Sequence, residues 1–195
     1  MSNEKYKTNL LHFYSNVIKK NSKFLFFALS MSLILLFVFM FYQNFQENQN
    51  IQIAEQYSKA SILMKQNKKK ESKVLLEAVI SKDHTFYSPL ALYFIIDNNI
   101  ENDNSKIIKH FDKILENSSI NKENLNLIKI KKAIYLINLD KEETIVATLN
   151  PIVNSNSIWK DTAIYLIYEY FLSKGQKFKA EEYIKLLNKK FQNNK

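Results

Sequence analysis

Residues 24–42 read FLFFALSMSLILLFVFMFY, a run of nineteen residues without a charged side chain. As a helix rising 1.5 Å per residue, this run spans roughly 28 Å, close to the ~30 Å hydrocarbon core of a bilayer. Its polar side chains are Ser30 and Ser32, and each can hydrogen-bond back to its own helix. A buried core helix is the alternative, but a domain this small has no core deep enough to surround it. The sequence therefore predicts a transmembrane helix over residues 24–42.

A cleaved signal peptide would also begin with a basic segment and an apolar run, but its cleavage site needs small residues. Here the run ends in Met40-Phe41-Tyr42 and continues into Gln43-Asn44-Phe45. These side chains are too large for the peptidase pocket. We therefore expect an uncleaved anchor.

The charges on either side of the run predict its orientation. Residues 1–23 carry one acid, Glu4, and five lysines: Lys5, Lys7, Lys19, Lys20 and Lys23. The first fifteen residues after the run carry Glu47 and Glu55 and no lysine. Because positive charge is retained on the cytoplasmic side, residues 1–23 should be cytoplasmic and residues 43–195 external. The basic tail is either a topogenic flank or a segment that lies on the anionic inner surface.

The composition favours helices over a fold rich in tight turns. The chain has no Cys and no Arg, one Gly and two Pro. Tight turns usually depend on Gly and Pro, so long helices with polar connections are expected. Without Cys there can be no disulfide framework and no thiolate metal site. The net charge of +9 comes from Lys alone and is accompanied by no nucleic-acid-binding motif, so we expect no nucleic-acid partner.

Beyond Ile51, apolar residues recur at helical spacing and polar clusters interrupt them every fifteen to twenty residues. The pattern predicts eight helices, the first over about 47–66. The others follow the lysine-rich joint 65–70, open at Ser88-Pro89, follow the polar stretch 97–105, start at Asn121, follow Asp140, span 158–173 and follow Gly175. Paired by short joints, they predict an all-α fold: a single transmembrane helix followed by an α-solenoid of about four helical hairpins. A four-helix bundle is the competing topology.

The last predicted hairpin resembles a tetratricopeptide repeat (TPR). The residues that carry this resemblance are Tyr165, Tyr168, Phe171, Gly175, Ala180, Tyr183 and Leu187. In that repeat the Gly closes the turn between two helices, and a small residue five positions later lets the helices touch. Earlier hairpins place Asn67 and Leu139 at the Gly position, with Ser72 and Thr144 as the small residues.

Taken whole, the chain resembles the bacterial YfgM-type family, ancillary to the SecYEG translocon. The shared features are a basic tail, the anchor at 24–42, Ser88-Pro89 opening the second hairpin, and the Gly175/Ala180 pair. The resemblance implies an inner-membrane protein with a periplasmic TPR-like domain at 43–195. It also implies three kinds of protein partner: translocon subunits, a membrane-anchored periplasmic chaperone, and emerging client polypeptides.

No sequence motif predicts chemistry, so we expect no enzyme, metal or cofactor site. His12, His84 and His110 are far apart in the sequence and belong to no metal-binding spacing. The acidic joint at 97–104 lacks the Gly turn and the closing Glu of a calcium loop, so we expect a solvated hinge there. There is also no nucleophile elbow and no Gly-rich phosphate loop.

A binding surface is the remaining prediction. Tyr and Trp supply large, rigid contact areas with a polar group, as protein interfaces often require. The candidate partner-binding residues are Tyr57, Tyr87, Tyr93, Tyr135, Trp159, Tyr165 and Tyr168. Each could equally pack within a hairpin. The leading hypothesis is a translocon-associated scaffold, and the alternative is a TPR interaction protein of cell division or cell-wall synthesis. An enzyme with a composite site shared with a partner is a third class, with little in the sequence to favour it.

Overall fold

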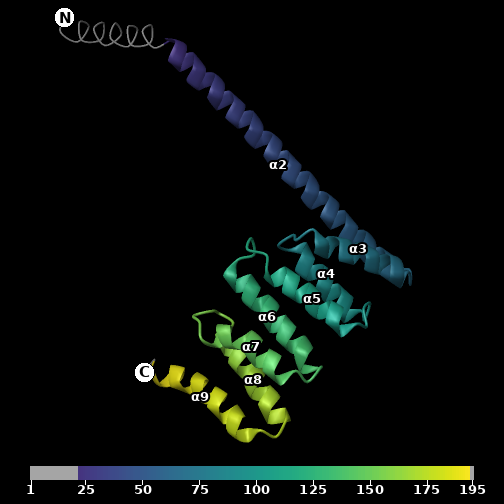
Figure 1. Ribbon diagram of the computed structural model, residues 1–195, viewed down its shortest axis with the longest axis vertical. Helices are drawn as coiled ribbons and strands as arrows, with labels where there is room; N and C mark the ends of the chain where they lie inside the picture. Colours follow the sequence, from purple (N-terminus) through teal and green to yellow (C-terminus); the bar gives the residue numbers. More distant parts are fainter. Residues whose placement is uncertain (1–21, 194–195) are drawn as a thin grey trace, which may run out of the picture. The chain divides into compact units, whose positions relative to one another are not determined.

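The computed structural model describes residues 22–193, and these residues form eight α-helices and no β-strand (Figure 1). The all-α fold is therefore confirmed. Most of residues 1–23, including His12, lie outside the described part of the chain. The helices are α2 (Ser22–Lys65), α3 (Lys69–Ser81), α4 (Tyr87–Asp97), α5 (Asn104–Leu115), α6 (Lys122–Ile137), α7 (Glu142–Val153), α8 (Lys160–Ser173) and α9 (Lys177–Asn193).

Helix α2 joins two segments that the sequence pattern separates. The predicted anchor ends at Tyr42 and the first external helix was expected from about residue 47, but α2 continues without a break from Ser22 to Lys65. The intervening sequence at 43–50, QNFQENQN, is polar but contains no Gly or Pro that would interrupt the backbone hydrogen bonds. A change in polarity therefore does not end the helix.

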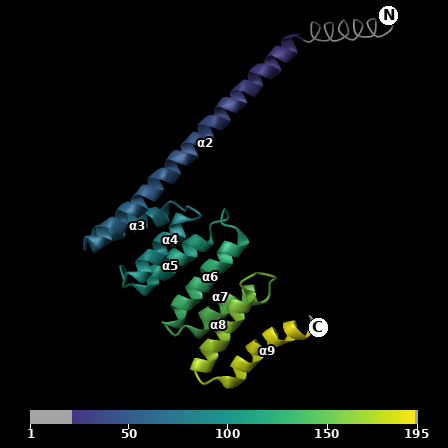
Figure 2. The ribbon, with the colours of Figure 1, turned by 180° about the vertical axis from the view of Figure 1, so that it is seen from behind.

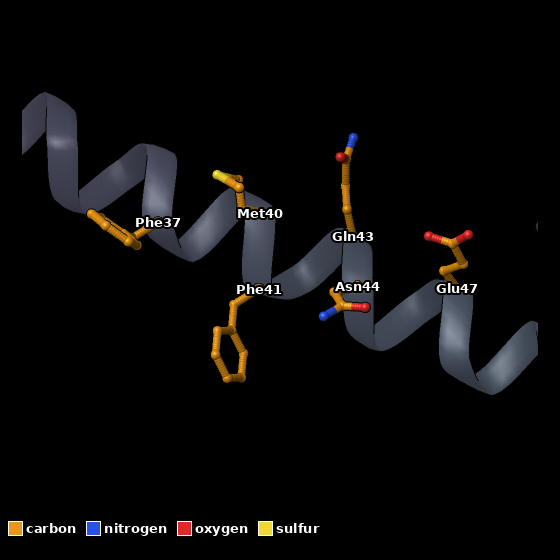
Figure 3. Close-up of a pocket in the computed structure, with 6 residues that line it drawn as sticks. All are labelled: Phe37, Met40, Phe41, Gln43, Asn44 and Glu47. Atoms are coloured by element: carbon orange, nitrogen blue, oxygen red, sulfur yellow. The ribbon is translucent and has the colours of Figure 1, made fainter.

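The apolar part of α2 is long and apolar enough to cross a membrane. Signal sequences and core helices share such length and composition, but none of this apolar window is buried in the protein. Figure 3 shows where its character changes, from Phe37, Met40 and Phe41 to Gln43, Asn44 and Glu47. These six side chains project from one helix, so the hollow they line is the open side of α2. The chain divides into two compact units, Met1–Gln52 and Ile53–Lys195.

In the second unit, each helix from α3 to α9 packs against the next one in the chain, and α6 also contacts α8 (Figures 1 and 2). Two groups of buried side chains result. One gathers around Leu76, Leu92 and Phe111 and the other around Leu136, Leu149 and Ile164. Helix α6 contributes to both groups, so it is the element that joins the two halves of the core.

Two residues expected on buried helix faces are exposed instead. Val74 of α3 is 65% exposed, and the buried side of that helix is Ser72, Leu76, Val79 and Ile80. Ile134 of α6 is 42% exposed. Helical periodicity shows that one face is apolar, but it leaves the angle of that face uncertain by about one residue.

Four turns between helices share one backbone geometry. Asn67, Asn99, Asp140 and Gly175 have φ of 60°, 47°, 54° and 70°. In each turn the amide of the next residue donates to a carbonyl five residues back, for example Gln176 N to Phe171 O at 2.9 Å. This is a Schellman motif, which satisfies the last carbonyls of a helix and reverses the chain. Asn and Asp tolerate the left-handed region better than other residues that carry a Cβ, so a chain with one Gly can still make these turns.

The turn predicted at Leu139 is at Asp140, one residue later. Five residues beyond the true turn residue is Ile145, which is fully buried, whereas Thr144 is exposed. The small residues expected at Ser72 and Ala180 are buried as predicted. The Ser72 hydroxyl also donates a 2.8 Å hydrogen bond to the Ala60 carbonyl, which ties α3 to the end of α2.

The acidic joint between α4 and α5 is a structured connection, not the expected solvated hinge. The Glu101 side chain is 9% exposed and accepts a 2.5 Å hydrogen bond from Lys73 of α3. Its second oxygen accepts from the amides of Asn102 and Asp103. These bonds, with that from Lys73 foremost, lower the pKa of Glu101 to about 2. Asp103 then caps α5 through the Ser105 amide.

We expect Gly175→Ala to lower the free energy of unfolding by about 1 kcal/mol, because a Cβ disfavours the left-handed region. A Cβ at this position would meet no atom within 4 Å, so the cost is purely conformational. Gly175→Asn should cost less than half as much, since Asn already makes the same turn at Asn67 and Asn99. Urea unfolding followed by circular dichroism measures both changes; equal costs for Ala and Asn would contradict the explanation.

Glu101 should make the protein acid-sensitive over a defined range. Its folded pKa of about 2 lies below the ordinary value of 4.5, so the carboxylate stabilises the fold above about pH 4.5 and loses this effect as the pH falls toward 2. The urea midpoint of Glu101→Gln should therefore be lower than that of the wild type at pH 7, and the difference should shrink at pH 3. A difference that is constant over this range would argue against the ion pair.

Candidate binding surface

A trough between α4 and α6 is the most extensive apolar hollow of the second unit. It consists of two hollows of about 290 and 240 Å³ that share the side chain of Tyr93. The start of α4 and the start of α6 line the first, and the ends of the two helices line the second. The two helices therefore run parallel. The lining residues are Thr85, Phe86, Pro89, Leu90, Tyr93, Asn124, Leu127 and Ile128 in the first hollow, and Tyr93, Ile96, Asp97, Phe111, Lys131, Ile134, Tyr135 and Asn138 in the second.

Helix α4 supplies the trough because it is apolar on more than one side. Its buried face is Ala91, Leu92 and Ile95, which enter the core. Leu90, Tyr93 and Ile96 follow one another at a spacing of three residues, so they share a different face of the same helix. Pro89 occupies the first turn, where its missing N–H has no cost. The apolar residues left over from the core thus line the trough.

Tyr93 separates the two hollows and carries an unsatisfied polar atom. Its hydroxyl is buried and has no hydrogen-bond partner among the described residues. Burial raises the pKa of Tyr93 to about 12. The ring packs 6.5 Å from the Phe111 ring, and the Lys131 ammonium lies 5.8 Å from its centroid. A buried hydroxyl without a partner destabilises a fold, so one that persists is a candidate for a bond to a bound molecule.

The second hollow is the polar end of the trough. Asp97 of α4 and Lys131 of α6 both line it, together with the Asn138 amide. Tyr135 closes this end and donates a 2.6 Å hydrogen bond to the Asn104 side chain of α5. Burial raises the pKa of Tyr135. The trough therefore offers an apolar floor, with a carboxylate, an ammonium and an amide at one end.

The other five candidate residues lie in two further groups. Tyr57 packs with Tyr87 and Phe94 at centroid distances of 5.9 Å, and both tyrosines contact the first core group. Trp159 and Tyr168 pack against the second core group. Tyr165 is 52% exposed and lies 5.9 Å from Tyr168. The seven residues thus do not form one site: the trough brings Tyr93 and Tyr135 together, and most of the others pack within the domain.

Sequence reasoning missed the aliphatic part of the trough. Leu90, Leu127 and Ile134 have the same spacing as core residues, so no local signal separates them from the core. A search restricted to aromatic residues with polar groups finds Tyr93 and Tyr135 but not the surface around them. What distinguishes the aliphatic residues is the helix on which they face, and this depends on the packing.

The two described histidines have structural surroundings. The Nδ1 atom of His84 accepts hydrogen bonds from the amides of Phe86 and Tyr87, both at 3.1 Å, and so holds the start of α4. Burial lowers the pKa of His84 and of His110. Within residues 22–193, no three His, Cys, Asp or Glu side chains gather in a way that could hold a metal ion.

The trough and the apolar part of α2 are thus the two features from which a function can be argued. One is a surface that fits an apolar polypeptide segment, and the other is a helix that could cross a membrane. No family model, curated protein or solved structure matches this chain.

Proposed function

We propose that this protein is a membrane-anchored, non-enzymatic scaffold of the bacterial envelope that binds polypeptide segments in the trough between α4 and α6. The observation that carries the proposal is the trough itself, where Tyr93 keeps a buried hydroxyl without a partner between two apolar hollows. A bound peptide would cover the exposed side chain of Ile134 and supply an acceptor or donor for the Tyr93 hydroxyl. Both effects favour the complex over the free surface.

The external domain is, in this proposal, an α-solenoid of four TPR-like hairpins. The pairs are the end of α2 with α3, α4 with α5, α6 with α7, and α8 with α9. Sequential packing along the chain and the four Schellman turns support this assignment. So does the close approach of Ala60 and Ser72, which are both fully buried. In such an array the first helices of successive hairpins line one common surface.

The membrane placement follows from the charges on either side of the apolar run. Residues 24–42 are the proposed anchor, the basic tail 1–23 is cytoplasmic, and residues 43–195 are periplasmic. The resemblance to the YfgM-type family adds the proposed setting, beside the Sec translocon. The proposed partners are translocon subunits, a membrane-anchored chaperone and emerging client polypeptides. The alternative is an interaction protein of cell division or cell-wall synthesis, which would use the same architecture.

A topology reporter tests the orientation. Alkaline phosphatase fused after Lys195 should be active, because it would be exported with the external domain, and a reporter that works only in the cytoplasm should be inactive there. The opposite pair of results would reverse the orientation. Replacing Lys19, Lys20 and Lys23 with Glu should reduce phosphatase activity, since these lysines keep the tail inside.

Two substitutions in the trough should separate stability from binding. Tyr93→Phe removes a buried hydroxyl without a partner, so we expect the free energy of unfolding to stay the same or rise by up to about 1 kcal/mol. If the hydroxyl bonds a bound segment, the same change should weaken binding about fivefold or more. Ile134→Asp should abolish binding, because it places a charge in the apolar hollow, and should cost little stability at a side chain that is 42% exposed.

Affinity purification from native membranes in mild detergent, followed by mass spectrometry, measures this binding. Val74→Asp is the matched control, since Val74 is equally aliphatic and 65% exposed but does not line the trough. Proteins retained by the wild type and by Val74→Asp but lost from Ile134→Asp bind the trough. Channel subunits and a chaperone among them support the translocon setting, whereas division or wall-synthesis proteins support the alternative. Identical recovery from all variants would contradict binding in the trough.

A further inference from the structure

The helices α4, α6 and α8 all begin at one edge of the second unit. The starts of α4 and α6 meet across the first hollow of the trough. At the start of α8, the Ser157 hydroxyl and the Ile158 amide both donate to Glu123 in the first turn of α6, at 2.6 and 3.2 Å. The connections α3–α4, α5–α6 and α7–α8 therefore share this edge, which we call the entry edge (Figures 1 and 2).

Two large apolar side chains project from the entry edge into solvent. Phe86, just before α4, is 62% exposed, and Ile158, just before α8, is 76% exposed. Both are held by the backbone bonds of their own turns. The Phe86 amide donates to His84 Nδ1 at 3.1 Å, and the Ile158 amide donates to Glu123. Rigid presentation of apolar groups reduces the entropy lost when a surface binds them.

The opposite edge, where α4, α6 and α8 end, has a different character. Its turns contain Glu101, Asp103, Asp140 and Glu142, which bind lysines or backbone amides of the same domain. Carboxylates at this edge would be repelled by an anionic surface. At the entry edge, Lys82 and Lys122 are exposed beside the two apolar side chains, while Asp83 is paired with Lys113 at 3.3 Å. Residues 53–195 as a whole carry 23 lysines against 17 acids.

The proposed anchor keeps this domain close to lipid. Residues 43–52, between the apolar run and the second unit, reach at most roughly 35 Å even when fully extended. A surface tethered at this range meets the bilayer at a high effective concentration, so a weak affinity is enough to hold it there. Exposed Phe and Ile side chains flanked by Lys are the composition that inserts at the boundary between headgroups and acyl chains.

We propose that the entry edge rests on the surface of the anionic bilayer that holds α2, with Phe86 and Ile158 inserted among the lipids. This inference depends on the proposed membrane anchor. It assigns the domain an orientation on the membrane, with the entry edge toward the lipid and the polar end of the trough away from it.

The single tryptophan of the sequence, Trp159, reports on this contact because it lies next to Ile158 and the anchor contains none. The full-length protein would be reconstituted into phosphatidylglycerol-containing vesicles, with and without brominated acyl chains. We expect brominated lipid to quench Trp159 emission. Phe86→Ser with Ile158→Ser should restore the emission, expressed for each variant as the ratio between the two vesicle types.

Serine suits both positions, because Phe86 is the N-cap of α4 and both side chains are largely exposed. Phe178→Ser is the matched control: Phe178 is 75% exposed but lies in the first turn of α9, at the opposite edge. Far-UV circular dichroism verifies that each variant is folded. Quenching that survives Phe178→Ser but not the double substitution supports the proposal.

Two results would overturn it. Absence of quenching in wild-type protein that resists alkaline extraction from the vesicles refutes the lipid contact and leaves the anchor standing. Quenching that is equal in the wild type and the double variant refutes the role of Phe86 and Ile158. Protein that is extracted from the vesicles at alkaline pH refutes the anchor, and with it the basis of this inference.

Discussion

The arrangement of the second unit depends on chain reversal at residues in the left-handed region. Each Schellman turn lets a helix end with its carbonyls satisfied and sends the chain back along the helix it has just left. The amphipathic helices are too short to be stable alone, so each buries its apolar face on its neighbour in the chain. The turns at Asn67, Asn99, Asp140 and Gly175 therefore determine which faces meet.

Repeated reversal has a geometric consequence for function. Alternate helices run in the same direction, so the starts of α4, α6 and α8 gather at one edge and their ends at the other. The faces that these helices do not bury form a continuous surface, and the trough around Tyr93 is part of it. A single principle of packing thus creates both the trough and the entry edge.

The two edges are held together differently. At the acidic edge, side chains bridge successive turns: Tyr170 and Lys174 both bind Asp140 at 2.8 Å, and Gln176 and Lys179 bind Glu142. The bond to Asp140 and burial of the ring raise the pKa of Tyr170 to about 12. These contacts use up the charges of that edge within the domain. At the entry edge, Glu123 holds the turn before α8, and the apolar side chains of Phe86 and Ile158 are left facing solvent.

The sequence by itself determined the helical class, the apolar run at 24–42, most helix starts and the small residues at Ser72 and Ala180. These features follow from local chemistry: periodicity, capping residues such as Asn121, and the absence of charge over a membrane-length segment. Local polarity misled in one place, since the predicted gap after Tyr42 is part of one helix with no residue to break it. The tertiary structure alone decided that Glu101 is a buried ion-pair partner and that Asp140, not Leu139, makes the turn. It also decided which apolar stripe becomes the trough. An apolar face has the same spacing in sequence whether a neighbouring helix covers it or not, and only the packing of distant segments decides whether it is covered.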